Sequence, residues 1–115
     1  LDVCIQVNID GGPTKSGVLP HEAAALARAV AALPRLRLRG LMTIPEPAPD
    51  VETQQQVHGR AKALFDQIAA AGLPGLAHFD TLSMGMTADL EAAIHAGATM
   101  VRVGTAIFGT RAQAA

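Results

Sequence analysis

The chain has 115 residues and a formal net charge of −1; half of its residues are hydrophobic, but only 3% are aromatic. A near-neutral chain without a basic stripe is atypical of nucleic-acid-binding proteins, and no apolar stretch reaches the length of a membrane span. A core of Ala, Leu, Val, Ile and Met is typical of helices packed on a parallel sheet. The single cysteine, Cys4, cannot form an internal disulfide, so we expect a reducing, cytoplasmic setting.

The predicted elements alternate between strands and helices. Apolar alternation predicts the first strand, Pro20 opens the first helix, Gly72 ends the second, and Thr87 is the expected N-cap of the third, which stops at Gly97. Leu26, Val30 and Leu33 form the expected apolar stripe of the first helix. The expected strands span residues 3–9, 36–44, 79–83 and 99–103, and the expected helices span 20–33, 50–71 and 87–96.

This order predicts an α/β fold with a parallel sheet and right-handed crossovers. Four βα units form either a small open sheet or half of a (β/α)8 barrel. Two observations favour the half-barrel: the polar residues gather after strands, and Gly40 and Gly104 suit a tightly curved sheet. The chain also opens at Leu1 directly on a strand, so we expect residues 1–115 to be the C-terminal half of one barrel domain, with the N-terminal half absent.

The segment 100–109 is the first candidate site. Arg102 ends a short strand, Gly104 lets a backbone approach an anion closely, and Thr105 adds a hydroxyl at a helix start. From this segment alone, phosphate binding and a buried last strand with Arg102 in a structural ion pair are equally good interpretations.

A second anion cradle is predicted at residues 82–87. Ser83 ends a strand, Gly85 gives a tight turn over Met84 to Met86, and a helix follows at Thr87. These two segments follow consecutive strands of the expected barrel and therefore lie next to each other at its rim. One phosphate can contact both segments, which favours ligand binding over ordinary turns.

Other reactive residues make no predicted site. Lys15 lies in a glycine-containing loop that lacks P-loop spacing and is expected to be solvated. The histidines have no metal-ligand spacing, His58 falls among polar residues of a helix, and Cys4 is expected in the core. We therefore predict no metal site and no catalytic residue.

The motifs resemble those of the pyridoxal 5′-phosphate (PLP) homeostasis proteins, relatives of the alanine racemase N-terminal barrel. They occur in family order and span nearly the whole chain. The segments that carry the resemblance are Gln6-Val7-Asn8-Ile9, Lys15-Ser16-Gly17, Arg39-Gly40-Leu41-Met42-Thr43-Ile44-Pro45, the run from Leu82-Ser83-Met84-Gly85-Met86-Thr87 to Ile94, and Val101-Arg102-Val103-Gly104-Thr105-Ala106-Ile107-Phe108-Gly109.

The resemblance implies a fold-type-III barrel that holds PLP at its C-terminal rim. Ser83, Gly104 and Thr105 would hold the phosphate, the Met84 backbone would line the same pocket, and Arg102 would face the pyridine nitrogen and keep it unprotonated. In this family the Schiff-base lysine lies on an early strand, in the half that is absent here, so neither Lys15 nor Lys62 takes that role.

The resemblance further implies a non-enzymatic carrier that buffers PLP and delivers it to apo-PLP enzymes. One alternative is a fold-type-III racemase or decarboxylase, which needs a second, β-rich domain that supplies a tyrosine in the racemase; this chain stops at Ala115 and has no Tyr. Another alternative is a barrel that binds a different phosphorylated metabolite.

Overall fold

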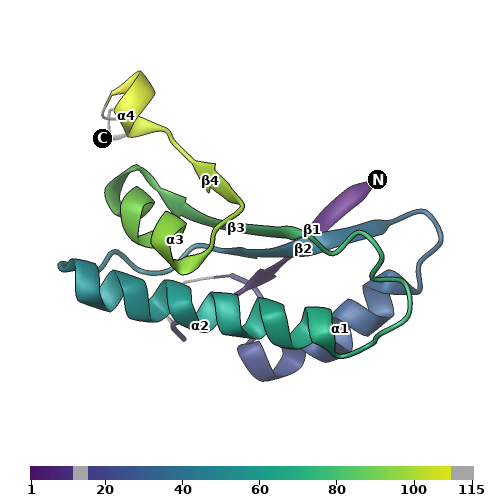
Figure 1. The fold of residues 1–115 in the computed structure, drawn as a ribbon. Coiled ribbons are helices and arrows are strands. Elements are labelled where there is room, and N and C mark those ends of the chain that lie inside the picture. The colour runs from purple at the N-terminus through teal and green to yellow at the C-terminus, as the bar shows by residue number, and fades with distance from the viewer. Residues whose placement is uncertain (12–15, 110–115) are drawn as a thin grey trace.

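The computed structural model describes residues 1–11 and 16–109. Strands and helices alternate along this part of the chain (Figure 1). No helix in the described ranges is long and apolar enough to cross a membrane. The strands are β1 (Asp2–Val7), β2 (Arg37–Thr43), β3 (Thr81–Met86) and β4 (Met100–Arg102); the helices are α1 (Pro20–Ala31), α2 (Val51–Ala70), the 3-10 helix η1 (Thr87–Asp89), α3 (Leu90–Ala96) and α4 (Thr105–Phe108).

The four strands form one parallel sheet in the order β1-β2-β3-β4. Each strand therefore pairs with its neighbour in the sequence, as in an arc of a (β/α)8 barrel. A doubly wound sheet would instead reverse its order at a switch point. The predicted parallel α/β class is confirmed, and the sequential order fits the barrel form of that class.

The core lies on one face of the sheet, against α1 and α2 (Figure 1). Alternate strand residues point into it because successive side chains of a strand face opposite sides. In α1 the fully buried residues are Ala23 and Ala27; Leu33, predicted on its apolar stripe, lies past the helix end and is half exposed, so that part of the prediction is wrong. The larger buried side chains are Ile5, Val7, Leu38, Leu41, Phe65, Ile68, Leu82 and Met84.

No helix in the described part of the chain covers the other face of the sheet. Cys4 lies on this open face and is exposed, so its predicted place in the core is wrong. The reason is the alternation of β1, in which Ile5 and Val7 take the helix side and leave Cys4 on the opposite side. Partial burial still raises the pKa of the Cys4 thiol, with the Arg39 charge acting in the opposite direction.

Strand β3 is longer than predicted and runs through Met84 to Met86, so the predicted turn over these residues is wrong. It contains an irregularity instead: Ser83 pairs with Met100 and Met86 pairs with Arg102, three steps on β3 against two on β4. Gly85 has φ +101° within this bulge, and a Cβ there would lie 2.5 Å from the Cβ of Ala93. The glycine thus permits both the bulge and the close approach of α3.

The two glycines that suit a tightly curved sheet, Gly40 and Gly104, differ in the space around their Cβ positions. A Cβ on Gly40 would lie 1.5 Å from the carbonyl oxygen of Thr81, so β2 and β3 approach too closely for any side chain there. Gly104 follows β4, and apart from Gly104 and its two neighbours in the sequence, no atom of the described chain lies within 4 Å of its Cβ position. The prediction that sheet curvature requires Gly104 is therefore wrong.

Most helix ends follow their sequence signals; the exceptions are the end of α1, which lies at Ala31 rather than at residue 33, and the start of α3. Asp50 caps α2 by accepting from the Thr53 amide (2.7 Å), and Gly97 ends α3 with φ +112°. Thr87 was predicted as the N-cap of α3, but it is instead the first residue of η1. The Asp89 carboxylate caps η1, since it accepts from the Met86 amide at 2.8 Å, whereas α3 has no side-chain hydrogen bond at its N-cap.

Candidate functional site

Arg102 joins three strands on the open face of the sheet. From β4, its Nη1 donates to Ser83 Oγ (2.7 Å) and more weakly to the Ser83 carbonyl (3.4 Å), and its Nη2 donates to the carbonyl of Thr43 on β2 (2.7 Å). The parallel register brings the three residues together because the carboxyl ends of β2, β3 and β4 meet at one edge. Ser83 is only 5% exposed, so its hydroxyl is held firmly beneath the guanidinium.

The guanidinium places a permanent positive charge at this edge. Burial lowers the pKa of Arg102, and the nearby Asp89 carboxylate raises it in part. Arginine stays charged at neutral pH in spite of such shifts. In the described structure Arg102 donates to neutral oxygens of Ser83 and Thr43. The structural ion pair, which was the alternative interpretation of Arg102, is not formed there.

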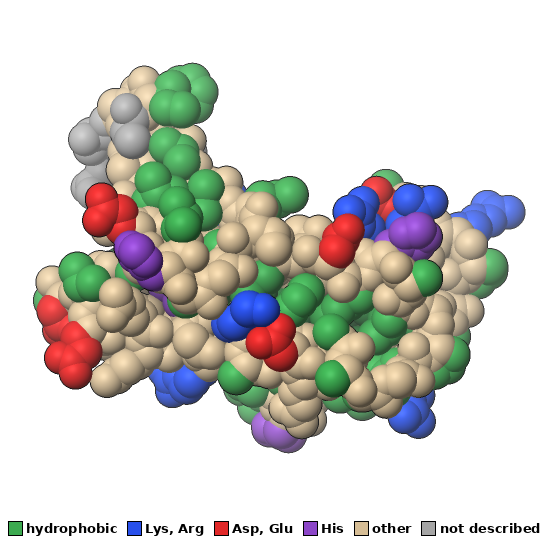
Figure 2. All heavy atoms as spheres, in the orientation of Figure 1, with side chains coloured by type: hydrophobic (Ala, Val, Ile, Leu, Met, Phe, Trp, Pro, Cys, Tyr) green, Lys and Arg blue, Asp and Glu red, His purple; other side chains and the backbone are tan. Residues whose placement is uncertain are grey.

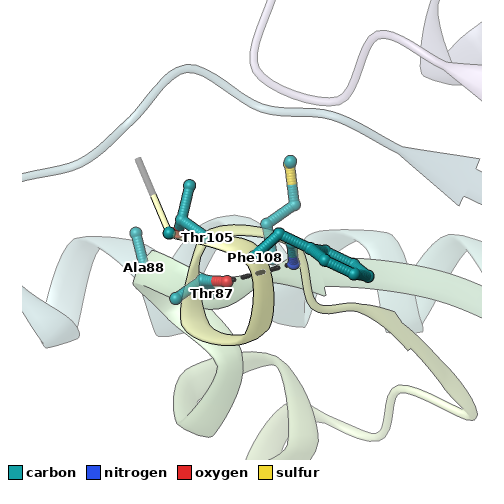
Figure 3. A pocket seen from close by; sticks show the side chains of 7 residues that line it. Thr87, Ala88, Thr105 and Phe108 are labelled. Atoms are coloured by element: carbon teal, nitrogen blue, oxygen red, sulfur yellow. Dashed lines mark hydrogen bonds between the residues drawn. The ribbon is translucent and has the colours of Figure 1, made fainter. Parts of the chain in front are cut away.

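A pocket of about 590 Å³ lies next to Arg102, where the end of β3 meets α4 (Figure 3). The Thr87 hydroxyl accepts from the amide of Gly104 (3.3 Å), and this contact joins the two turns that form the pocket. Residues from both segments that are predicted as anion cradles therefore line one pocket. The lining residues are Met86, Thr87, Ala88, Gly104, Thr105, Phe108 and Gly109.

A smaller hollow of about 100 Å³ adjoins this pocket, and Met86 and Ala88 line both. Arg102 lines the smaller hollow, whereas Gly104 and Thr105 line the larger one. The site is thus an apolar-walled depression with the arginine at one side and the glycine turn at the other.

The other two predicted residues lie beneath this depression. Ser83 lines neither hollow, but its hydroxyl accepts a hydrogen bond from Arg102, which lines the smaller one. The Met84 side chain is fully buried in the core. Met84 as a whole is 0% exposed in the described structure, so the contact between its backbone and a phosphate stays a prediction from the resemblance.

The glycine turn fits a phosphate group. Only Gly104 itself and its two neighbours in the sequence can lie within 4 Å of the Gly104 Cβ position in the described chain, so an anion can approach the backbone there, and Thr105 adds a hydroxyl. Helix α4 has only four residues, so its dipole adds less than the sequence reading assumed. Open space, hydroxyls and the adjacent guanidinium are the features that favour an anion.

Sequence reasoning missed two groups near this site. Thr87 was interpreted as a cap, yet its hydroxyl lines the pocket; its position directly after the Ser-Met-Gly-Met run was the available signal. His58 was placed among polar residues, yet it is fully buried and its Nε2 lies 2.7 Å from Asp89 Oδ2. No local signal indicates that pair, because its partners are 31 residues apart.

Lys62 does not join the site. Lys62 pairs with Asp66 one turn further along α2 (2.6 Å). Lys15 lies outside the described residues. Beside it, Gly17 has φ +111° and its Cβ position lies 2.7 Å from the carbonyl oxygen of Gln6, so this loop end is fitted tightly to β1.

The chain matches a known protein family along almost its whole length. The family model described as "Alanine racemase, N-terminal domain" matches residues 1–112. The chain is 52% identical over 111 residues to the pyridoxal phosphate homeostasis protein of Pasteurella multocida, covering 96% of this chain and 47% of that protein. It is 54% identical over 112 residues to the protein of the same name from Escherichia coli, covering 96% and 46%.

A solved structure shares the fold. PipY of Synechococcus elongatus, determined with PLP bound, is 30% identical and superposes with a TM-score of 0.78 over 94% of this chain and 49% of PipY. The chain spans about half the length of the curated relatives that it matches. The family-model match over almost the whole chain, together with the shared parallel fold, shows that the chain belongs to the alanine racemase N-terminal domain family.

Proposed function

We propose that this chain provides the phosphate-holding part of a PLP site in a protein of PLP homeostasis. The observation that carries the proposal is the pocket beside Gly104, with Arg102 and Ser83 joined at its side. It is supported by the names of the relatives and by the PLP-bound PipY structure, which is similar over 94% of the chain.

In this proposal Gly104 and Thr105 contact the phosphate, and the Met84 backbone and Ser83 support it from the end of β3. Ser83 Oγ accepts a hydrogen bond from Arg102, which leaves the hydroxyl proton to donate to an anion. The arginine thereby orients the serine as well as contributing charge.

Arg102 has a second proposed role toward the pyridine ring. A guanidinium that faces the ring nitrogen disfavours protonation of that nitrogen, because two positive charges would then lie close together. When bound, PLP supplies an electron sink for amino-acid chemistry, and an unprotonated ring is a weaker sink. This arrangement favours a carrier, which buffers PLP and delivers it to apo-PLP enzymes in the cytoplasm, over an enzyme.

The parallel sheet also supports a proposal about the whole domain. We infer that residues 1–115 form the C-terminal half of one barrel and that the lysine that bonds the cofactor lies in the N-terminal half. The sequential strand order and the open face of the sheet support this inference.

The proposal is tested by titrating the full-length gene product with PLP while its absorbance spectrum is recorded, with intact mass before and after borohydride treatment. We expect a shifted visible band and a borohydride-stable mass increment that maps outside residues 1–115. A protein that takes up no PLP would contradict the proposed function.

A further inference from the structure

His58 is a buried polar residue that the proposed roles leave unexplained. It lies in the middle of α2 and is fully buried, among residues that are otherwise apolar. Its Nδ1 has no hydrogen-bond partner in the described structure, so the ring is held through Nε2 alone. Burying an imidazole with one nitrogen unpaired costs free energy, so the hydrogen bond of the other nitrogen must offset that cost.

That bond joins α2 to the turn at the end of β3. Nε2 lies 2.7 Å from Asp89 Oδ2, and because a carboxylate only accepts, the nitrogen must donate. The other carboxylate oxygen, Oδ1, accepts from the Met86 amide at 2.8 Å. Asp89 thus bonds the helix with one oxygen and the turn with the other.

The turn held in this way forms one wall of the pocket. Met86, Thr87 and Ala88 all line it, and Thr87 reaches across to the Gly104 amide. A continuous set of contacts therefore runs from His58 through Asp89 to the glycine turn where the phosphate is expected.

We propose that His58 is a positioning residue for the phosphate pocket: its hydrogen bond to Asp89 fixes the Met86–Ala88 turn and, through Thr87, the backbone at Gly104. This inference rests on the proposed function for the identity of the ligand. The positioning of the turn itself is measurable without any ligand.

The test uses the full-length gene product and three variants. His58→Leu fills a similar volume but removes the donor, whereas His58→Gln keeps an N–H at a similar reach. Ile68→Val is the control, since Ile68 is also fully buried on the same helix and lies ten residues after His58. Each protein is titrated with PLP and with pyridoxal, which lacks the phosphate, and amide exchange at Met86 and Gly104 is measured without ligand.

We expect His58→Leu to weaken PLP binding about tenfold, to leave pyridoxal binding within about twofold, and to accelerate exchange of the Met86 amide. His58→Gln should restore both properties, and Ile68→Val should match the unaltered protein. Equal losses for PLP and pyridoxal, or unaltered PLP binding by His58→Leu, would overturn the inference.

Two further outcomes are also decisive. If His58→Leu fails to fold, Asp89→Asn takes its place, and unaltered PLP affinity and Met86 exchange in that variant would overturn the proposal. If the unaltered protein binds no PLP, the proposed function fails, and amide exchange alone decides the positioning role: accelerated exchange at Met86 in His58→Leu supports it, and unchanged exchange refutes it.

Discussion

The close approach of β2 and β3 makes a strong prediction about Gly40→Ala. The added Cβ would lie 1.5 Å from the Thr81 carbonyl oxygen. Because an ordinary carbon–oxygen contact is about 3.3 Å, β3 would have to withdraw by roughly 1.8 Å. The neighbouring hydrogen bond from the Asp80 amide to the Arg39 carbonyl, now 2.8 Å, does not survive that movement.

The expected cost is about 3 to 5 kcal/mol, from about two lost ladder hydrogen bonds at about 1 kcal/mol each and about 1 to 3 kcal/mol of overpacking. Urea unfolding of the full-length gene product, followed by circular dichroism, measures it. Gly104→Ala is the matched control: its φ is −112° and its Cβ position is open, so we expect a change below about 1 kcal/mol. A Gly40→Ala cost as small as that of the control would refute the reasoning.

Three other predictions concern the site and the acid limb of stability. Gly104→Ala should weaken PLP binding more than pyridoxal binding in paired titrations, because the methyl group enters the space assigned to the phosphate. An equal loss of affinity for the two ligands would contradict that assignment. Thr87→Val should weaken PLP binding several-fold while Thr87→Ser retains it, since only the serine keeps an acceptor for the Gly104 amide; equal effects would exclude the hydroxyl. The hydrogen bond from Arg39 holds the pKa of Asp80 below its ordinary value, so this carboxylate stabilises the fold above about pH 4 and loses that contribution as the pH falls through the lowered pKa. Asp80→Asn should therefore flatten the acid side of the stability curve, and an unchanged acid limb would exclude this pair as a contributor.

The strands and most helix ends could be predicted because their causes are local. Alternation along β1, the Asp50 cap and the Gly97 stop each depend on residues within one turn or one strand. Gly40 is also correctly predicted to lie where the sheet has no room for a side chain, because a glycine inside a strand often marks such a position.

The features that escaped prediction depend on contacts between distant segments. The bulge at Gly85 is defined only by the pairing of β3 with β4, and Cys4 is exposed only because no described helix covers its side of the sheet. His58 is surrounded by polar residues in the sequence of its own helix, and its partner Asp89 lies 31 residues away, so no local pattern indicates that it is buried and paired. For the site, the motif order predicts the edge of the sheet at which the pocket lies, but it does not predict that Thr87 joins the two turns of that pocket.

The reach of Arg102 across β3 to β2 has a thermodynamic consequence. Strand β4 has only three residues, so we expect it to open more readily than the longer strands β1, β2 and β3. Because the arginine on this strand also bonds Ser83 and Thr43, detachment of β4 removes the charge from the site in the same event. A ligand that binds only the docked form raises the free energy of that opening by mass action. Occupancy of the site and order of the sheet edge are therefore linked equilibria, and bound ligand should slow amide exchange along β4.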